Sequence, residues 1–147
     1  RKTIPGLRLA QKYAVRVGGG KNHRIGLYDG ILIKENHIMA AGGIGPALKA
    51  ALASVPADVM VQIEVESLVD LVEAINHGAK LVLLDNFTVA QLREAVHIAG
   101  GRAELEASGG IDLKTVRAIA ETGVVRISIG ALTKDINAID LSLRFKT

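Results

Sequence analysis

The chain has 147 residues, of which 49% are hydrophobic, so it is long enough to bury the single core of one domain. The absence of cysteine excludes a disulfide framework and a thiolate metal site, and it favours a cytoplasmic location. No hydrophobic run approaches the roughly 20 residues that cross a bilayer, and the first residues do not resemble a signal peptide. We therefore expect neither membrane insertion nor export.

The formal net charge of +3 is modest, but eight of the 18 Lys and Arg residues lie within the first 34 positions. They are Arg1, Lys2, Arg8, Lys12, Arg16, Lys21, Arg24 and Lys34. This basic segment predicts an anionic ligand. Nucleic acid is disfavoured because the segment has no continuous basic run, and only Tyr13 and Tyr28 offer aromatic rings for stacking.

From residue 31 onward, short apolar runs alternate with helical patterns. The runs cover residues 31–33, 59–65, 81–84, 103–107 and 124–129. Because they are continuously hydrophobic, they are typical of buried parallel strands. A helix is predicted over 46–54, and apolar residues at helical spacing predict further helices near Leu68, Val89 and Val116 that cover the sheet. The pattern indicates one α/β domain.

Helix ends are also marked in the sequence. Thr88 and Asp112 are suited to N-cap the helices that follow them. Gly78, Gly100 and Gly123 are predicted to end helices, because glycine readily adopts the left-handed conformation found there.

Polar or small residues recur where the predicted strands end. Glu64, Asp85, Ser108 and Gly130 are 21, 23 and 22 residues apart, which is one βα unit each. In parallel βα folds, ligands bind at the carboxyl ends of the strands. We therefore expect these four positions to face one site.

Two of these turns are rich in glycine and suit phosphate. Ser108-Gly109-Gly110 and Gly130 would let backbone N–H groups approach an anion. Tight turns alone would explain the same glycines, and the spacing does not separate the two interpretations.

Glu64 and Asp85 offer hard oxygen ligands suited to Mg²⁺, which binds through one or two carboxylates plus substrate phosphates. The alternative for either carboxylate is a strand-end cap. Glu66 would share the face of Glu64 if the strand continues, and we favour Glu64.

Seven motifs together resemble one family. They are RKTIPGLR (1–8), GGGKNHR (18–24), IKENH (33–37), EVE (64–66), LDNF (84–87), SGG (108–110) and GALTK (130–134). In order, spacing and wording the chain closely resembles the quinolinate phosphoribosyltransferases over essentially its whole length. Each tripeptide alone is weak, but the joint pattern is specific.

The resemblance implies an incomplete, open α/β barrel of parallel βα units over residues 1–147, the catalytic barrel domain of a type II phosphoribosyltransferase. It implies transfer of phosphoribosyl from phosphoribosyl pyrophosphate to quinolinate with Mg²⁺, which gives nicotinate mononucleotide, pyrophosphate and CO₂ in de novo NAD biosynthesis. Family members also have an N-terminal α/β sandwich domain, which this sequence lacks. They are dimers in which that domain completes the partner's site, so we expect a part of a longer, homodimeric or larger protein, catalytically poor by itself.

The resemblance also implies roles for individual residues. Lys2, Glu64 and Asp85 would be catalytic. The quinolinate carboxylates would be surrounded by Arg1, His23, Arg24 and Lys34. Phosphoribosyl pyrophosphate would be bound by Lys2, Glu64, Asp85, Ser108, Gly109, Gly110 and Gly130, with Mg²⁺ at Glu64 and Asp85, partly through the pyrophosphate. Secondary candidates are Asn86, Lys134 and His37, whereas His77 and His97 are expected to be structural or at the surface.

Three other interpretations remain open. The chain could belong to a phosphoribosyltransferase that uses nicotinate or nicotinamide, although the cluster of cations favours a dicarboxylate. It could be a paralogue attached to molybdate uptake, which the retained site pattern disfavours. It could also be a non-catalytic barrel domain that binds phosphosugars or serves as an assembly interface.

Overall fold

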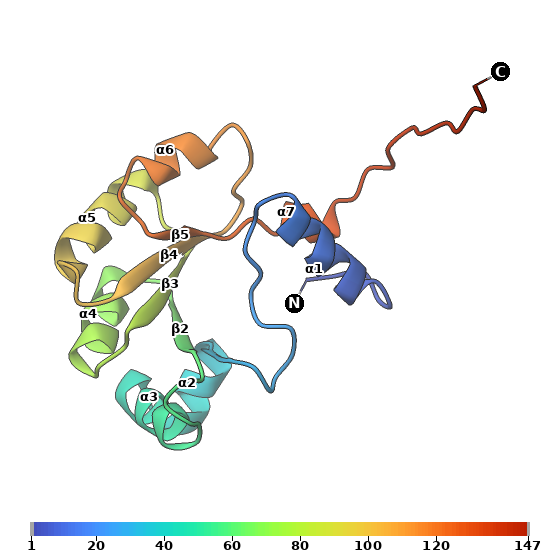
Figure 1. Ribbon diagram of the computed structural model, residues 1–147. Helices are drawn as coiled ribbons and strands as arrows, with labels where there is room; N and C mark the ends of the chain where they lie inside the picture. The colour runs from blue at the N-terminus through green and yellow to red at the C-terminus, as the bar shows by residue number, and fades with distance from the viewer. Residues whose placement is uncertain (1, 147) are drawn as a thin grey trace. The chain divides into compact units, whose positions relative to one another are not determined.

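The computed structural model describes residues 2–146 (Figure 1). Contacts divide this part of the chain into two compact units. The sheet unit comprises residues 23–129 and the terminal unit comprises residues 2–22 and 130–146. Arg1 lies outside the described residues.

The sheet unit is built on a parallel sheet. Within residues 2–146 the sheet has five strands in the order β1-β2-β3-β4-β5, and each pairs with its neighbour in parallel. The strands are β1 (Ile31–Ile33), β2 (Val61–Val65), β3 (Leu81–Asp85), β4 (Glu104–Ser108) and β5 (Arg126–Ile127). Strand order that follows chain order is the topology of successive βα units, so the predicted α/β class is confirmed.

Helices follow the strands in the chain. They are α2 (Glu35–Ala41), α3 (Ile44–Ala53), α4 (Leu68–Asn76), α5 (Val89–Ala99) and α6 (Val116–Ala120). Figure 1 shows α4, α5 and α6 on the same side of the strands. The predicted helices at 46–54 and near Leu68, Val89 and Val116 are therefore present, whereas α2 was not expected from the sequence.

One face of the sheet is apolar and carries the core. Ile63, Val82 and Leu84 are fully buried, as are Leu71 of α4 and Leu92 of α5. Alternate residues of a strand point to opposite faces. The buried residues of each strand thus form one face, which the helices remove from water.

The other face is mixed. Leu81 and Leu83 of β3 are buried on it, as expected for a continuously hydrophobic strand, whereas β2 and β4 add polar residues. Gln62 and Glu64 alternate with the buried residues of β2, and Glu106 alternates with those of β4. Gln62 and Glu106 are themselves buried and hydrogen-bonded to each other across 2.8 Å. Buried polar groups of this kind must find partners, so this face is organised by specific contacts.

β5 is shorter than the predicted strand over 124–129. Its regular pairing covers two residues opposite β4. Hydrogen bonds from Val125 N to Leu105 O (3.0 Å) and from Ser128 N to Ala107 O (2.9 Å) continue the contact at both ends. β5 therefore holds Ser128 beside β4 although the strand itself is brief.

The predicted helix ends are largely confirmed. Gly100 ends α5 in the left-handed conformation, and Gly78 and Gly123 follow α4 and α6 with positive φ. Asp112 is an exception, because α6 begins only at Val116. The Asp112 carboxylate instead accepts hydrogen bonds from the backbone N–H groups of residues 114 and 115 and so caps the turn before the helix.

Thr88 caps α5 through a capping box with Gln91, since each side chain accepts from the other residue's backbone N–H. We expect Thr88→Ala to lower the free energy of unfolding by about 1 kcal/mol, because one helix N–H loses its partner. Urea denaturation measures the change. Unchanged stability would contradict the assignment of Thr88 as the cap.

The terminal unit contains α1 (Arg8–Val17) and α7 (Ala131–Lys134). Gln11 of α1 is buried, accepts from the backbone N–H of Ile4 and donates to the carbonyl of Thr133 at 2.9 Å. These bonds join the N-terminal segment to α7. Within residues 2–146, no helix combines the length and apolar character that crossing a bilayer requires.

Candidate functional site

Two predicted site residues lie side by side at the carboxyl edge of the sheet. Asp85 is the last residue of β3, Ser108 is the last residue of β4, and the two are register partners. Glu64 pairs with Leu83, two residues before Asp85, so Glu64 and Asp85 point to the same face from neighbouring strands. The sheet unit therefore gathers three of the predicted positions on one edge.

Lys34 and Glu64 form an ion pair. Lys34 follows β1, and its Nζ donates to Glu64 Oε1 at 2.9 Å. The Glu64 side chain is 11% exposed whereas Glu66 is exposed to solvent, so Glu64 is the residue directed to the polar face. The pair places a cation expected to bind substrate beside a carboxylate expected to face the sugar.

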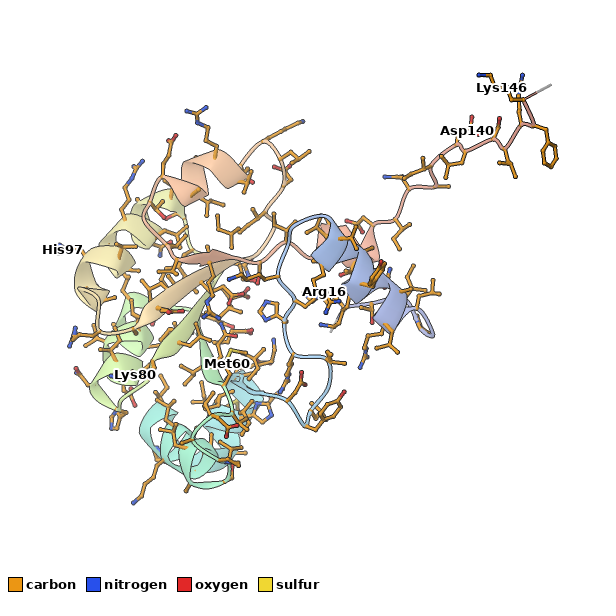
Figure 2. The ribbon with its side chains drawn as sticks, in the orientation of Figure 1. Arg16, Met60, Lys80, His97, Asp140 and Lys146 are labelled. Atoms are coloured by element: carbon orange, nitrogen blue, oxygen red, sulfur yellow. The ribbon has the colours of Figure 1, made fainter. Side chains whose placement is uncertain are left out.

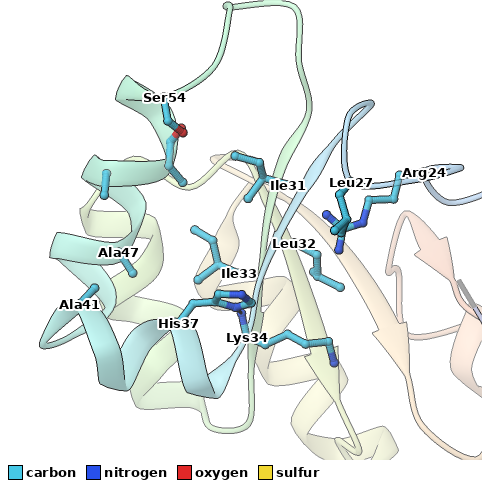
Figure 3. Close-up of a pocket in the computed structure, with 12 residues that line it drawn as sticks. Arg24, Leu27, Ile31, Leu32, Ile33, Lys34, His37, Ala41, Ala47 and Ser54 are labelled. Carbon is cyan, nitrogen blue, oxygen red and sulfur yellow. Dashed lines mark hydrogen bonds between the residues drawn. The ribbon is translucent and has the colours of Figure 1, made fainter.

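A cavity of about 600 Å³ lies against β1. Arg24, Lys34 and His37 line it together with apolar residues such as Ile33 and Ala47 (Figure 3). Its lining includes neither Glu64 nor Asp85. The cavity is thus a mainly apolar space next to the cationic residues and not the carboxylate edge itself.

Arg24 and His37, which line this cavity, form hydrogen bonds with the backbone. Arg24 Nη1 donates to Gly30 O at 2.6 Å, which anchors the loop before β1. His37 Nδ1 accepts from the backbone N–H of Lys34 at 3.0 Å and so belongs to the cap of α2. His37 therefore helps to cap α2, while its role as a secondary site residue stays a prediction.

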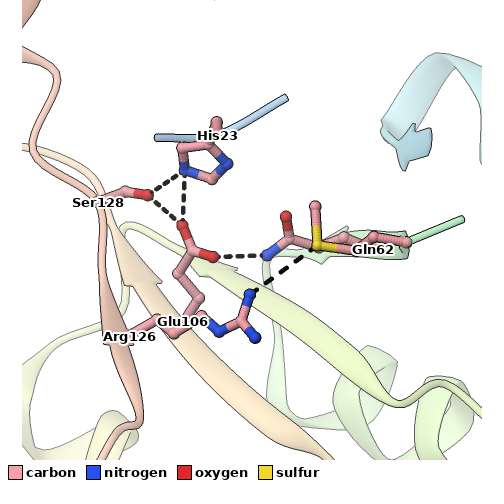
Figure 4. Close-up of polar contacts among 6 residues, drawn as sticks. His23, Gln62, Glu106, Arg126 and Ser128 are labelled. Carbon is pink, nitrogen blue, oxygen red and sulfur yellow. Dashed lines mark hydrogen bonds and ion pairs between the residues drawn. The ribbon is translucent and has the colours of Figure 1, made fainter. Parts of the chain in front are cut away.

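His23 belongs to a polar network that sequence reasoning missed (Figure 4). Its Nε2 lies 2.9 Å from Glu106 Oε1 and 2.6 Å from Ser128 Oγ. Ser128 Oγ donates to Glu106 Oε1 in a short hydrogen bond, and Gln62 Nε2 donates to Glu106 Oε2 at 2.8 Å. The available signal was the position of Glu106 two residues before Ser108, inside an apolar run.

Burial by itself raises the pKa of the Glu106 carboxyl, because a charge is costly away from water. Hydrogen bonds from His23, Ser128 and Gln62, with the charge of protonated His23, more than offset this and hold the pKa below its usual value of 4.5. Glu106 is therefore a carboxylate at neutral pH although it is only 3% exposed.

Acid sensitivity follows from this pKa. Because the pKa of Glu106 is lower in the folded protein than in the unfolded chain, its carboxylate stabilises the fold fully above about pH 4.5, and the contribution is lost as the pH falls through the folded pKa. Glu106→Gln is therefore expected to be less stable than wild type at pH 7, with a difference that narrows below pH 4.5. Urea denaturation across this range measures it, and a difference that does not change with pH would contradict the assignment.

The turns after β3 and β4 interlock. Asn86 adopts a positive φ of 57°, donates from its backbone N–H to Ser108 O at 2.9 Å and from Nδ2 to Asp85 Oδ2 at 2.8 Å. Gly109 has a φ of +102°, and a Cβ placed there would lie 2.8 Å from Asn86 Cγ and 3.0 Å from Asn86 N. Gly109 is thus required by close approach to Asn86, the secondary candidate beside Asp85.

The terminal unit gathers other predicted residues. Thr133 Oγ1 donates to the carbonyl of Lys2 at 2.7 Å. A Cβ placed on Gly130 would lie 3.7 Å from Lys134 Cε and 3.9 Å from Lys2 Cδ. Lys2 and Lys134 therefore flank the glycine at the start of α7. Arg1, the remaining predicted residue, is outside the described part of the chain.

His97 and His77 are the two histidines expected to be structural or at the surface. His97 is exposed on α5 (Figure 2). His77 is hydrogen-bonded to Glu73 O at 2.9 Å and packs closely against Gly45.

No group of three His, Cys, Asp or Glu side chains within residues 2–146 could enclose a metal ion. Glu64 and Asp85 nevertheless fit Mg²⁺ that arrives with a polyphosphate, since this ion binds through one or two carboxylates and keeps phosphate and water ligands.

The chain is similar to several known proteins. It is 46% identical over 143 residues to a probable nicotinate-nucleotide pyrophosphorylase (carboxylating) of Bacillus subtilis, covering 97% of this chain and 50% of that protein. It is 42% identical over 165 residues to quinolinate phosphoribosyltransferase (decarboxylating) 2a, mitochondrial, of Nicotiana tabacum, covering 100% of this chain and 47% of that one. The chain thus spans about half the length of these relatives.

Solved structures agree in fold. The nicotinate-nucleotide pyrophosphorylase of Francisella tularensis superposes with a TM-score of 0.92 at 57% identity, over 97% of this chain and 50% of that chain. NadC of Streptococcus pyogenes gives a TM-score of 0.93 at 42% identity, over 99% and 51%. The family model described as "Quinolinate phosphoribosyl transferase, C-terminal domain" matches residues 1–144. The chain therefore belongs to the quinolinate phosphoribosyltransferase C-terminal domain family.

Proposed function

We propose that this chain is the catalytic half of a quinolinate phosphoribosyltransferase. The reaction joins the ring nitrogen of quinolinate to C1 of phosphoribosyl pyrophosphate, releases pyrophosphate and CO₂, and forms nicotinate mononucleotide. The observation that carries the proposal is the carboxyl edge of the sheet, where Glu64 pairs with the cation Lys34 and Asp85 points to the same face from the neighbouring strand. Family membership over residues 1–144 supports it independently.

The charges of this edge suit the chemistry of the sugar. Breaking the bond from C1 to pyrophosphate develops positive charge on the ribose, which the carboxylates of Glu64 and Asp85 would stabilise. Mg²⁺ would neutralise the departing pyrophosphate when bound through these carboxylates and the phosphates. The reaction needs no covalent nucleophile, so orientation of the two substrates is the main task of the protein.

The cations suit a dicarboxylate. Lys34 and Arg24 border one cavity, and His23 lies in the loop before β1. With Arg1 they would surround the two carboxylates of quinolinate, since Arg and Lys bind such groups through charge-assisted hydrogen bonds. Loss of CO₂ would then use the positively charged pyridinium ring as the electron sink.

The phosphate of the sugar would be held by small residues. Ser108 ends β4, Gly109 and Gly110 follow it, and Gly130 precedes α7. Their N–H groups could bind phosphate oxygens at close range. Lys2 beside Gly130 would add a positive charge.

The remaining parts of the proposal concern the whole protein. We infer that residues 1–147 form the C-terminal barrel domain, that an N-terminal α/β sandwich domain accompanies it, and that the protein is a homodimer or larger. The cytoplasm is the compartment inferred from the absence of cysteine, whereas the tobacco relative is named as mitochondrial.

The test compares quinolinate with nicotinate as the acceptor of the phosphoribosyl group. The full-length protein is incubated with phosphoribosyl pyrophosphate, Mg²⁺ and either quinolinate or nicotinate, and nicotinate mononucleotide is measured by chromatography. We expect product from quinolinate alone. Product from nicotinate alone would keep the phosphosugar part of the proposal and contradict the dicarboxylate part, and no product from either would favour a non-catalytic binding domain.

A further inference from the structure

The buried carboxylate of Glu106 is not needed for the chemistry proposed above, yet it is costly to bury. It is 3% exposed, and its neighbour Gln62 is 2% exposed. An ionised carboxylate away from water requires compensating hydrogen bonds and a counter-charge. The contacts of Glu106 therefore indicate what its buried charge does.

Its contacts converge from three elements. β2 contributes Gln62, which donates to Oε2, while Ser128 after β5 and His23 in the loop before β1 both reach Oε1. Figure 4 shows the carboxylate between these three side chains. Among the ion pairs of residues 2–146, the basic side chain that contacts Glu106 is His23, whereas Arg126 pairs with Glu104. The network thus holds a single histidine ring against a fixed carboxylate.

The hydrogen bonds determine which ring nitrogen carries a proton. The hydroxyl of Ser128 donates its one proton to Glu106, so Ser128 Oγ must accept at the 2.6 Å contact with His23 Nε2. An ionised carboxylate such as Glu106 can likewise accept hydrogen bonds but cannot donate them. His23 Nε2 therefore carries a proton and donates, and the ring is held in one orientation, with its side chain still 40% exposed.

We propose that Glu106 is a positioning residue for binding of the pyridine dicarboxylate, which it serves by fixing the protonated Nε2 edge of His23 inside the protein. This inference rests on the proposed function. A ring fixed in this way presents its exposed part in a constant geometry, so binding a substrate carboxylate costs less ordering of the side chain. The carboxylate would bind the protonated ring, in which both nitrogens carry N–H donors. Gln62 and Ser128 hold the carboxylate of Glu106 in place.

A double-mutant cycle on the full-length protein tests the inference. The dissociation constant for quinolinate is measured by isothermal titration calorimetry for wild type, Glu106→Gln, His23→Asn and the double variant. We expect Glu106→Gln to weaken binding about 10-fold, the size of a lost hydrogen bond to a charged group. Because Glu106 acts through His23, the double variant should bind no more weakly than His23→Asn alone.

Glu104→Gln is the matched control. Glu104 lies two residues earlier on β4 and forms an ion pair with Arg126 at 2.6 Å, but its side chain is 52% exposed. The Glu104→Gln variant also loses one carboxylate from the same strand and face. We expect its quinolinate affinity to stay within about twofold of wild type, since exposed ion pairs contribute little.

The Michaelis constant for phosphoribosyl pyrophosphate should be unchanged in Glu106→Gln.

Three results of the binding measurements would overturn the inference. One is quinolinate affinity of Glu106→Gln within twofold of wild type, and another is a loss that persists in full on the His23→Asn background. If Glu106→Gln does not fold, Ser128→Ala is used instead. We expect that variant to bind quinolinate about threefold more weakly, on the scale of one neutral hydrogen bond. Unchanged quinolinate affinity in Ser128→Ala is the third result.

Nitrogen-15 NMR of the histidine rings separates failure of this inference from failure of the proposed function. In the ligand-free protein we expect the His23 signal to report a proton on Nε2 in wild type and a change of the ring environment in Glu106→Gln but not in Glu104→Gln. If wild type does not bind quinolinate, the proposed function is wrong, and quinolinate is not the ligand of this site. A deprotonated Nε2 in the neutral ring would overturn the positioning contact regardless of binding.

Discussion

Asp85→Asn is expected to lower kcat of the full-length protein about 100-fold to 1,000-fold, the scale seen when one preorganised group that stabilises transition-state charge is removed. Asp85 ends β3 next to Ser108, and its negative charge is proposed to face the ribose as positive charge develops. Asparagine keeps the size of the side chain and an oxygen that can accept from Asn86 Nδ2, so the fold should be retained. Steady-state kinetics with quinolinate and phosphoribosyl pyrophosphate measure the effect.

Asp58→Asn is the control for this variant. Asp58 is exposed and precedes β2, at the opposite end of the strands from Asp85. We expect wild-type kcat from it. If Asp85→Asn retained more than a tenth of the wild-type kcat while remaining folded, the proposed role of Asp85 would be wrong.

Gly109→Ala is expected to weaken both the fold and the binding of phosphoribosyl pyrophosphate. The backbone there has φ +102°, and the new Cβ would press on Asn86, which it would approach to 2.8 Å at Cγ. Overpacking of this kind costs roughly 1 to 3 kcal/mol in addition to the strained backbone. Relief would require the turn of Asp85 and Asn86 to move, so substrate binding should fall together with stability. Urea denaturation and calorimetry with phosphoribosyl pyrophosphate measure the two effects.

Gly110→Ala separates crowding from backbone strain. Gly110 also has positive φ, +58°, but a Cβ there would meet nothing within 4 Å. We expect only the cost of the left-handed conformation, about 1 kcal/mol. Equal stability losses in the two variants would show that contact with Asn86 is not what requires glycine at position 109.

Much of the fold follows from local sequence patterns. The strand runs, the helix at 46–54 and the caps at Thr88 and Gly100 depend on neighbours along the chain, and the structure confirms them. α1 was not expected because its buried residues include the polar Gln11 and Lys12. Their burial depends on partners distant in sequence, such as Thr133 for Gln11, which no local pattern reveals.

The site could be predicted only in part. The spacing of Glu64, Asp85 and Ser108 correctly indicated a common edge, because parallel strands bring their carboxyl ends together. The buried contacts of Glu106 were missed, because Gln62 and Ser128 lie far from it in the sequence and no local pattern indicates that they surround its carboxylate. The proposed roles in substrate binding came from the resemblance of motifs and not from spacing.

The most direct test of the central claim is the stoichiometry of the complete reaction. The full-length protein is supplied with quinolinate that carries an isotopic label in the 2-carboxylate, together with phosphoribosyl pyrophosphate and Mg²⁺, and labelled CO₂ and nicotinate mononucleotide are measured in parallel. We predict one CO₂ for each nicotinate mononucleotide formed, with both products absent when phosphoribosyl pyrophosphate is omitted. Formation of neither product by a folded, full-length protein would contradict the assignment of this chain as the catalytic half of the enzyme.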